Sequence, residues 1–163
     1  ELISAIFPYA KILIPYRNPI QHAYSLLSQH KRFIEDSKKD KFISNYMRWI
    51  GHTEFGPNYI PIHIKNLHFN NYFDINHWIE QWYLSYHSCL ESLKDQDNVY
   101  FIRYEQLCSS KDYWLDLLKI LDIKQTYDFQ FKESKKNIPL EIEHSIGNKA
   151  LSLYSELSNI TLR

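Results

Sequence analysis

The chain contains little glycine, with only three glycines in 163 residues. A loop rich in glycine, of the kind that lets backbone N–H groups surround a phosphate, is therefore absent from the sequence. The two cysteines, Cys89 and Cys108, are too few for a disulfide framework and form no Cys-x-x-Cys pair. We expect both to be reduced packing residues. The histidines and acidic residues do not have the spacing of metal ligands, so no metal site is expected.

Long apolar runs and an excess of one charge are also missing. The apolar stretches are far shorter than the ~20 residues that span a bilayer, and no signal peptide is visible in the given sequence, although one could lie upstream of it. Nineteen basic residues balance nineteen acidic ones, which disfavours a nucleic-acid partner. We expect a soluble, cytoplasmic protein, and self-association into a homo-oligomer stays open. A length of 163 residues with 44% hydrophobic residues fits a single globular domain over residues 1–163.

Two short apolar runs predict buried strands. They cover residues 11–16 and 98–103 and contain β-branched and aromatic side chains. Because helical patterns separate them, we expect parallel strands joined by a right-handed crossover. Two strands are too few for a stable parallel sheet, so further strands are expected before Glu1. Glu105, at the turn after the second strand, is expected to bond nearby backbone.

Helical patterns occupy much of the remaining chain. The strongest follows Asp74, where apolar residues recur at i, i+3 and i+4 over residues 75–93. Further helical segments are predicted over residues 19–36, 41–51, 114–121 and 150–157. Residues 52–73 lack periodicity, and long irregular segments often shape binding sites. We interpret His63, His68 and His77 as polar loop residues.

Arg17 follows the first strand, where ligands collect in open α/β sheets. Asn18 suits the N-cap of the next helix and Pro19 suits its first position. Unpaired N–H groups at that N-terminus and the forked guanidinium would together bind an anion, with the Ser25 hydroxyl as a further donor. A structural arginine and a solvated serine are the alternative interpretation.

Two segments resemble a known family. Residues 7–19, with Ser25 eight residues after Arg17, resemble the segment by which sulfotransferases hold the 3′-phosphate of their donor, 3′-phosphoadenosine 5′-phosphosulfate (PAPS). Residues 99–107 resemble a later strand of that family, with Gln106 in place of its usual Asp. The order and spacing agree over residues 7–149. The resemblance implies an α/β fold, the P-loop NTPase-like three-layer α/β/α arrangement with a parallel sheet, here incomplete and helix-rich.

The resemblance also implies roles for individual residues. By position, Arg17 and Ser25 would hold the 3′-phosphate, and Tyr104 would approach the adenine or its ribose. Phe131 is a candidate to stack on the adenine. Residues 144–149 resemble a late loop that closes on the 3′-phosphate in some members, with Lys149 as the cation. An exposed lysine at a helix start is the alternative for Lys149.

The family's phosphate loop, which binds the 5′-phosphosulfate, has no counterpart in this sequence. Its place in the family falls before Glu1, as does the catalytic histidine of many members. We therefore expect a partial sulfotransferase domain that is inactive alone. The intact enzyme would transfer the sulfuryl group in line to a hydroxyl or amine and release 3′-phosphoadenosine 5′-phosphate (PAP). Positioning and cations would supply the catalysis without a metal.

The acceptor is expected to be a small molecule or a carbohydrate. His52 and Glu54, in the irregular segment, are candidates for a general base, and exposed loop residues are the alternative. Two motifs of animal cytosolic members are missing, which favours another branch, such as a bacterial one. Two other functions stay open. One is a P-loop-type small-molecule kinase, marked by an upstream Gly-Lys-Ser/Thr loop, and the other is a degenerate nucleotide-binding interaction module without catalysis.

Overall fold

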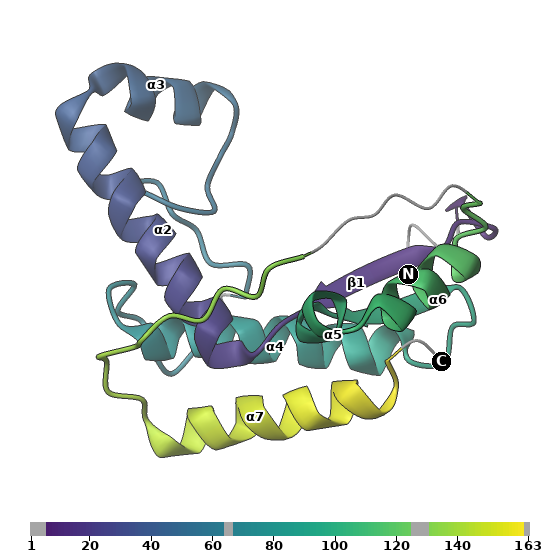
Figure 1. Ribbon diagram of the computed structural model, residues 1–163. Helices are drawn as coiled ribbons and strands as arrows, with labels where there is room; N and C mark the ends of the chain where they lie inside the picture. The colour runs from purple at the N-terminus through teal and green to yellow at the C-terminus, as the bar shows by residue number, and fades with distance from the viewer. Residues whose placement is uncertain (1–5, 64–66, 125–130, 162–163) are drawn as a thin grey trace.

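The computed structural model describes residues 6–63, 67–124 and 131–161. Its elements form a mixed α/β protein in which helices surround a small parallel sheet (Figure 1). In chain order they are β1 (Ile12–Tyr16), α2 (Pro19–Lys39), α3 (Lys41–Trp49), α4 (Ile75–Leu93), β2 (Val99–Arg103), α5 (Tyr104–Ser109), α6 (Lys111–Ile120) and α7 (His144–Asn159).

The two strands are parallel neighbours, as the sequence predicts. Ile12 pairs with Val99 at one end of the ladder, and Tyr16 pairs with Arg103 at the other. The residues that follow the two strands therefore emerge at the same edge of the sheet, which places the start of α2 beside the start of α5. In the described part of the chain, the sheet consists of these two strands.

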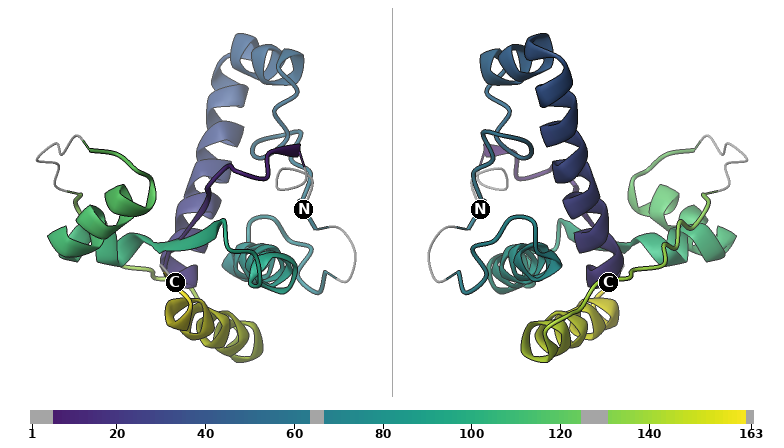
Figure 2. Two further views of the ribbon diagram at one scale, coloured as in Figure 1. Left: turned by 90° about the vertical axis from the view of Figure 1, so that its right-hand side faces the viewer. Right: turned by 90° about the vertical axis from the view of Figure 1, so that its left-hand side faces the viewer.

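Helix α2 begins where the sequence places it and runs beyond the expected end at Asp36. The Asn18 side chain caps it, since Oδ1 accepts hydrogen bonds from the N–H groups of Ile20 and Gln21 at 3.1 Å each. The helix ends at Lys39, because Asp40 leaves the helical conformation and its carboxylate caps α3. Figure 2 shows α2 rising away from α4 and α7 and bearing α3 at its far end.

The core lies where α2, α4 and α7 meet the sheet. Ala23 and Leu27 of α2 are almost fully buried, as are Ile79 of α4 and Ala150 and Leu157 of α7. Figures 1 and 2 show α7 running alongside α4 on the side away from α3. These helices bury one apolar stripe each, as amphipathic helices in a globular domain do.

Two helices after β2 differ from the sequence expectations. Helix α7 begins at His144 rather than near Ala150, because the Glu143 carboxylate caps it and accepts from the N–H of Ile146 at 3.1 Å. Residues 144–149 are therefore helical and do not form the expected loop. The short helix α5, directly after β2, has no counterpart among the predicted elements.

The first half of α4 is buried on every face. Residues 75–82 are all buried, because α2 and α7 pack against this helix and residues 52–63 and 67–73, here called the wrapping segment, also contact it. His77 lies in this helix and is 0% exposed, so its interpretation as a loop residue is wrong. Its ring bonds to the Tyr59 hydroxyl through Nε2 at 2.8 Å and to the Phe69 carbonyl through Nδ1 at 2.7 Å.

Glu80 is the charged member of this buried set. Its carboxylate accepts hydrogen bonds from the backbone N–H groups of His68 and Phe69 and lies 2.8 Å from the Nδ1 atom of His68. Burial acts to raise the pKa of Glu80, but these hydrogen bonds outweigh burial and hold the pKa below its ordinary value of 4.5. The ionised carboxylate therefore fastens the wrapping segment to α4.

Both cysteines are free thiols, so no disulfide joins Cys89 and Cys108. Among the described residues, no helix combines the length and the apolar character needed to cross a bilayer.

Glu80→Gln is expected to lower the free energy of unfolding at pH 7 by about 1–3 kcal/mol, because an amide cannot accept every hydrogen bond that the carboxylate accepts. A carboxyl with a lowered folded-state pKa stabilises the fold above its unfolded-state pKa. That stability is lost as the pH falls through the folded-state pKa. The wild type should therefore lose stability between about pH 5 and pH 3 more steeply than the variant.

Urea denaturation at each pH measures both effects. The matched control is Glu35→Gln, at an exposed position of α2, which should follow the wild type. An equal loss of stability on acidification for Glu80→Gln and the wild type would contradict this role of Glu80.

Candidate functional site

Arg17 directly follows β1, and two contacts hold its guanidinium group. The Cζ atom lies 5.1 Å from the centroid of the Tyr104 ring, which is a cation–π distance. The Nη2 atom donates a hydrogen bond to the carbonyl oxygen of Ser134. A guanidinium has five N–H donors, so further donors remain for a ligand.

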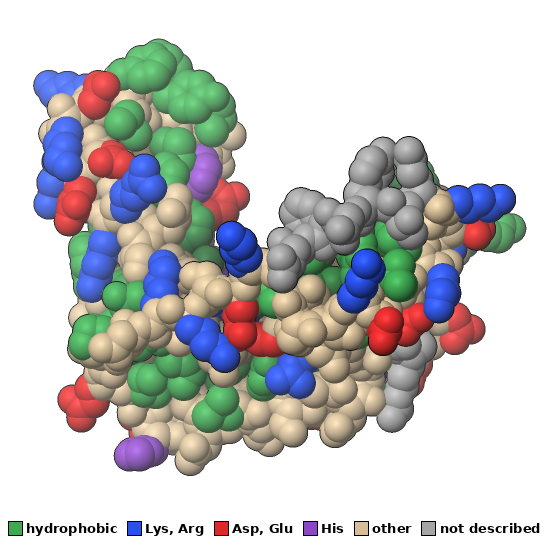
Figure 3. All heavy atoms as spheres, in the orientation of Figure 1, with side chains coloured by type: hydrophobic (Ala, Val, Ile, Leu, Met, Phe, Trp, Pro, Cys, Tyr) green, Lys and Arg blue, Asp and Glu red, His purple; other side chains and the backbone are tan. Residues whose placement is uncertain are grey.

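A cavity of about 420 Å³ opens beside Arg17. It is lined by Arg17, Asn18, Ile20, Gln21, Arg103, Glu105, Glu133, Lys135 and Tyr154. Two of its basic groups have acidic neighbours, since Arg103 Nε lies 3.6 Å from Glu105 and Lys135 Nζ lies 3.2 Å from Glu133. Figure 3 shows basic and acidic side chains adjacent on this face.

Arg17 differs from these two cations. Among the described residues, no carboxylate lies within ion-pair distance of its guanidinium. A group with two or three acceptor oxygens, such as a phosphate, suits a forked guanidinium of this kind. The cavity is therefore a candidate anion site with Arg17 as its main cation.

Glu105 joins the elements around this cavity. Its Oε1 atom accepts from the N–H of Asn18 at 2.8 Å, and its Oε2 atom accepts from the Tyr154 hydroxyl at 2.9 Å. The same hydroxyl accepts from Arg103 Nε at 2.9 Å. Burial, and then the Glu105 carboxylate, raise the pKa of Tyr154 to about 12, so the hydroxyl keeps its proton for this bond. The bond to Asn18 agrees with the expected backbone role of Glu105.

The N-terminus of α2 offers fewer free N–H groups than the sequence suggests. The N–H of Asn18 donates to Glu105, Pro19 has none, and those of Ile20 and Gln21 donate to the Asn18 side chain. The expectation of unpaired N–H groups is therefore wrong at these positions. An anion at this position would therefore meet the Arg17 side chain and the positive end of the helix dipole, rather than these N–H groups.

Residues 131–137, here called the strap, run past Arg17 and are fixed by hydrogen bonds. The Tyr104 hydroxyl donates to the Lys132 carbonyl oxygen at 2.8 Å. The Gln21 amide and the Lys136 backbone exchange two further bonds, at 3.0 and 2.9 Å. The strap is thereby attached to both elements that leave the sheet edge.

Among the predicted nucleotide-binding residues, Arg17 and Tyr104 are brought together. Ser25 lies on α2, one turn beyond Gln21, and its hydroxyl donates to the Gln21 carbonyl oxygen at 3.0 Å. Ser25 does not line the Arg17 cavity. Lys149 is exposed in the second turn of α7 and is also outside the lining.

Phe131, His52 and Glu54 lie in other surroundings. The Phe131 ring meets Trp114 of α6 edge to face, with centroids 5.4 Å apart. His52 Nδ1 lies 2.8 Å from Glu54 Oε2. The His52 ring also contacts the Phe33 ring in a tilted arrangement, with the two centroids 5.5 Å apart. Glu54 lines a different cavity from Arg17.

This second cavity, of about 560 Å³, lies between β1, α2, α4 and the wrapping segment. Most of its lining is aromatic or aliphatic, and we call it the apolar cavity. It is lined by Leu13, Ile14, Pro15, His22, Leu26, Glu54, Phe55, Tyr59, Ile60, Ile62, Trp78, Gln81, Trp82, Ser85, Tyr86 and Cys89. The sequence analysis did not identify His22 as a residue that lines a cavity. The only hint in the sequence was that His22 follows Arg17 by five residues on the same predicted helix.

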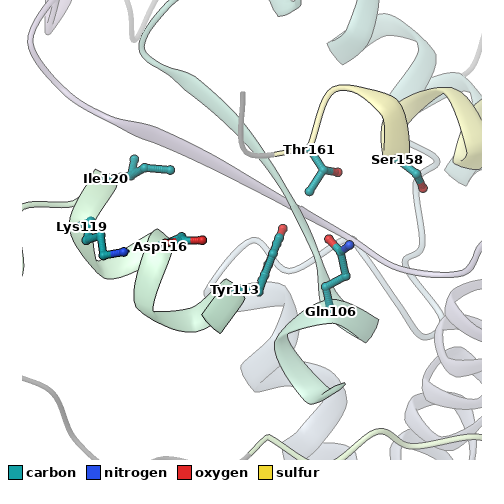
Figure 4. A pocket seen from close by; sticks show the side chains of 7 residues that line it. All are labelled: Gln106, Tyr113, Asp116, Lys119, Ile120, Ser158 and Thr161. Atoms are coloured by element: carbon teal, nitrogen blue, oxygen red, sulfur yellow. Dashed lines mark hydrogen bonds and ion pairs between the residues drawn. The ribbon is translucent and has the colours of Figure 1, made fainter. Parts of the chain in front are cut away.

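A third cavity, of about 450 Å³, lies between α5, α6 and the end of α7 (Figure 4). It is lined by Gln106, Tyr113, Asp116, Lys119, Ile120, Ser158 and Thr161. Lys119 Nζ lies 2.8 Å from Asp116 Oδ1, so this lysine already has an acidic partner. Within the described ranges, no cluster of three or more His, Cys, Asp or Glu residues could hold a metal ion.

A protein-family model described as the sulfotransferase domain matches residues 2–137. The match includes both strands, Arg17 and the whole strap. The chain therefore belongs to the sulfotransferase family, which confirms the resemblance found in its sequence. Searches of curated proteins and of solved structures returned no significant match.

Glu105→Ala is expected to lower the free energy of unfolding by about 1.5–3 kcal/mol, because the Asn18 N–H and the Tyr154 hydroxyl lose a charged acceptor. Glu105→Gln keeps one acceptor oxygen and should recover part of this loss. Urea denaturation measures the change, with Glu141→Ala as the control at an exposed position. A Glu105→Ala protein as stable as the control would show that Glu105 does not join these elements.

Proposed function

We propose that this chain forms the part of a sulfotransferase domain that binds the 3′-phosphate side of PAPS. The observation that carries the proposal is the guanidinium of Arg17, which lines a cavity at the edge of the sheet and has no ion-pair partner among the described carboxylates. Membership of the sulfotransferase family supports PAPS as the ligand. We also propose the P-loop-like three-layer α/β/α arrangement for the complete domain, of which the β1–β2 pair would be one part.

The 3′-phosphate would bind Arg17 through two parallel N–H···O bonds. In this arrangement Tyr104 holds the guanidinium from one side by its ring, while the bond to Ser134 must yield or be shared. Ser25 would join the phosphate only if its hydroxyl turned away from the Gln21 carbonyl oxygen. Lys149 does not line the cavity, so we rank Arg17 first.

The adenine would lie near the strap. Tyr104 is attached to the strap through Lys132, and Phe131 at the beginning of the strap offers an aromatic face or edge. Aromatic side chains suit the flat apolar surface of a purine, and base stacking is worth about 1–3 kcal/mol for each base. We propose Phe131 and Tyr104 as the residues on this side of the nucleotide.

The reaction would be an in-line transfer. An acceptor hydroxyl or amine forms a bond to sulfur, the bond from sulfur to the bridging phosphate oxygen breaks, and PAP leaves with the electron pair. A base takes the acceptor proton, and His52 with its neighbour Glu54 stays a candidate for this task. Positioning and positive charge supply most of the catalysis in such transfers. The groups that hold the 5′-phosphosulfate are not among the residues named here.

Arg17→Ala is expected to weaken PAP binding by at least about tenfold, because a charge-assisted contact is worth roughly 1.5–3 kcal/mol. It should leave AMP binding almost unchanged, since AMP has no 3′-phosphate. Calorimetric titration of the full chain with PAP and with AMP measures both. The wild type should bind PAP clearly more tightly than AMP.

The matched control is Arg32→Ala on the exposed side of α2, where the side chain pairs with Asp36. It should keep the preference for PAP. Equal binding of PAP and AMP by the wild type, or an unchanged preference in Arg17→Ala, would contradict the proposed site. The first of these results would favour an interaction module without nucleotide recognition.

A further inference from the structure

Helix α3 presents a row of large apolar side chains to solvent. Phe42, Tyr46, Trp49 and Ile50, here called the α3 stripe, are 61%, 48%, 69% and 54% exposed. Residues three or four positions apart share one face of a helix, so these side chains adjoin one another. The rings of Phe42 and Tyr46 stack with their centroids 5.9 Å apart. Single exposed apolar residues are ordinary, but a continuous stripe of this kind marks an interaction surface.

The described part of the fold leaves the α3 stripe uncovered. Helix α3 packs mainly against α2, and none of its residues is buried. Figures 1 and 2 show α3 at the far end of α2, away from α4, α7 and the sheet. No residue of α3 lines the Arg17 cavity or the apolar cavity. The stripe is therefore separate from both.

Positive charge surrounds the α3 stripe. Residues 31–50 contain six basic and three acidic residues, a net charge of +3, although the whole chain is neutral. Two of the acids are engaged, because Asp36 pairs with Arg32 at 3.5 Å and Asp40 accepts from the N–H of Phe42 at 2.8 Å. Among the described residues, no carboxylate lies within ion-pair distance of four of the basic side chains, those of Lys38, Lys39, Lys41 and Arg48. Figure 3 shows hydrophobic side chains gathered over α3, with charged side chains beside them.

The surface of an anionic lipid bilayer matches both properties. Trp and Tyr side chains combine an apolar ring with a polar tip, which suits the boundary between headgroups and hydrocarbon. Each basic residue beside such a face adds about fivefold in affinity for anionic lipid. The nine residues of α3 rise only about 14 Å, against a hydrocarbon core of about 30 Å. The helix would therefore lie in the interface and not cross the bilayer.

We propose that α3 docks this protein reversibly on membranes that contain anionic lipids. The α3 stripe would enter the headgroup region, and the neighbouring basic side chains would meet the lipid phosphates and carboxylates. A helix that projects from the body of the protein reaches a flat surface without obstruction (Figure 2). The inference does not rest on the proposed function, because no residue of α3 lines the Arg17 cavity.

The test is co-sedimentation of the full chain with lipid vesicles. One set contains phosphatidylcholine alone, and the other contains phosphatidylcholine and phosphatidylserine in about equal amounts. The wild type should bind the second set at least about tenfold more tightly. Brominated acyl chains should quench Trp49, whereas Trp78 and Trp82, each 3% exposed, lie in the core. Trp49→Phe should lose this quenching and still bind.

The double variant Phe42→Ser with Trp49→Ser removes the two most exposed rings of the α3 stripe. It should bind the phosphatidylserine vesicles at least about tenfold more weakly, because less apolar area enters the interface. The matched control is Leu151→Ser, at a leucine of α7 that is 41% exposed, which should bind like the wild type. Urea denaturation should show the same free energy of unfolding for all three proteins within about 0.5 kcal/mol, as is usual for surface substitutions.

A second variant, Lys39→Gln with Lys41→Gln, tests the charge and serves in place of the first if that protein does not fold. It should weaken binding to the phosphatidylserine vesicles by at least about tenfold and leave the weak binding to phosphatidylcholine unchanged. Lys94→Gln, at the exposed end of α4, is its control and should bind like the wild type.

The inference would be overturned by equal binding to the two vesicle sets, by no binding to either, or by wild-type binding in both double variants. A dimer in sedimentation velocity that Phe42→Ser with Trp49→Ser dissociates would also overturn it, because a second copy would then cover the α3 stripe. The same variant should keep the preference for PAP over AMP, so a failure of membrane docking is distinguishable from a failure of the proposed function.

Discussion

The arrangement of the candidate anion site depends on one carboxylate, Glu105. It stands after β2 and bonds both to the backbone at the start of α2 and to Tyr154 of α7. Parallel pairing of β1 with β2 brings Arg17 and Tyr104 out at the same sheet edge, and Glu105 then fixes the helix that begins there. With the first N–H groups of α2 already bonded, the proposed anion site relies on the guanidinium of Arg17. A charge held by a stacked ring on one side and a carbonyl oxygen on the other is oriented before a ligand arrives, which reduces the cost of ordering it on binding.

The second organising feature is the enclosed first half of α4. A helix that is buried all round needs partners for every polar side chain it contains. Here His77, Glu80 and Gln81 find them in the wrapping segment, residues 52–63 and 67–73. The wrap in turn forms one wall of the apolar cavity, whose opposite wall is β1 and α2. Helix α2 therefore borders both cavities, with Arg17 directly before its first turn and His22 one turn into it.

Sequence patterns predicted the strands, their parallel pairing, the N-cap of α2 and the extent of α4, because these depend on local periodicity and capping chemistry. The start of α7 was missed, since its cap is Glu143 rather than a residue type that usually marks a helix start. The free N–H groups expected at α2 were wrong because Glu105, distant in sequence, bonds to one of them. His77 was taken for a loop residue because its burial comes from a wrap without periodicity. His22 was not singled out for a similar reason: only packing of four separate segments turns one helix residue into the wall of a cavity.

The most direct test of the central claim is a crystal structure of the chain with PAP. The 3′-phosphate should lie within hydrogen-bond distance of the Arg17 guanidinium, with the adenine on the side of Tyr104 and the strap. A nucleotide bound in the cavity between α5, α6 and α7, or bound with its 3′-phosphate away from Arg17, would contradict the assignment of this sheet edge as the donor site.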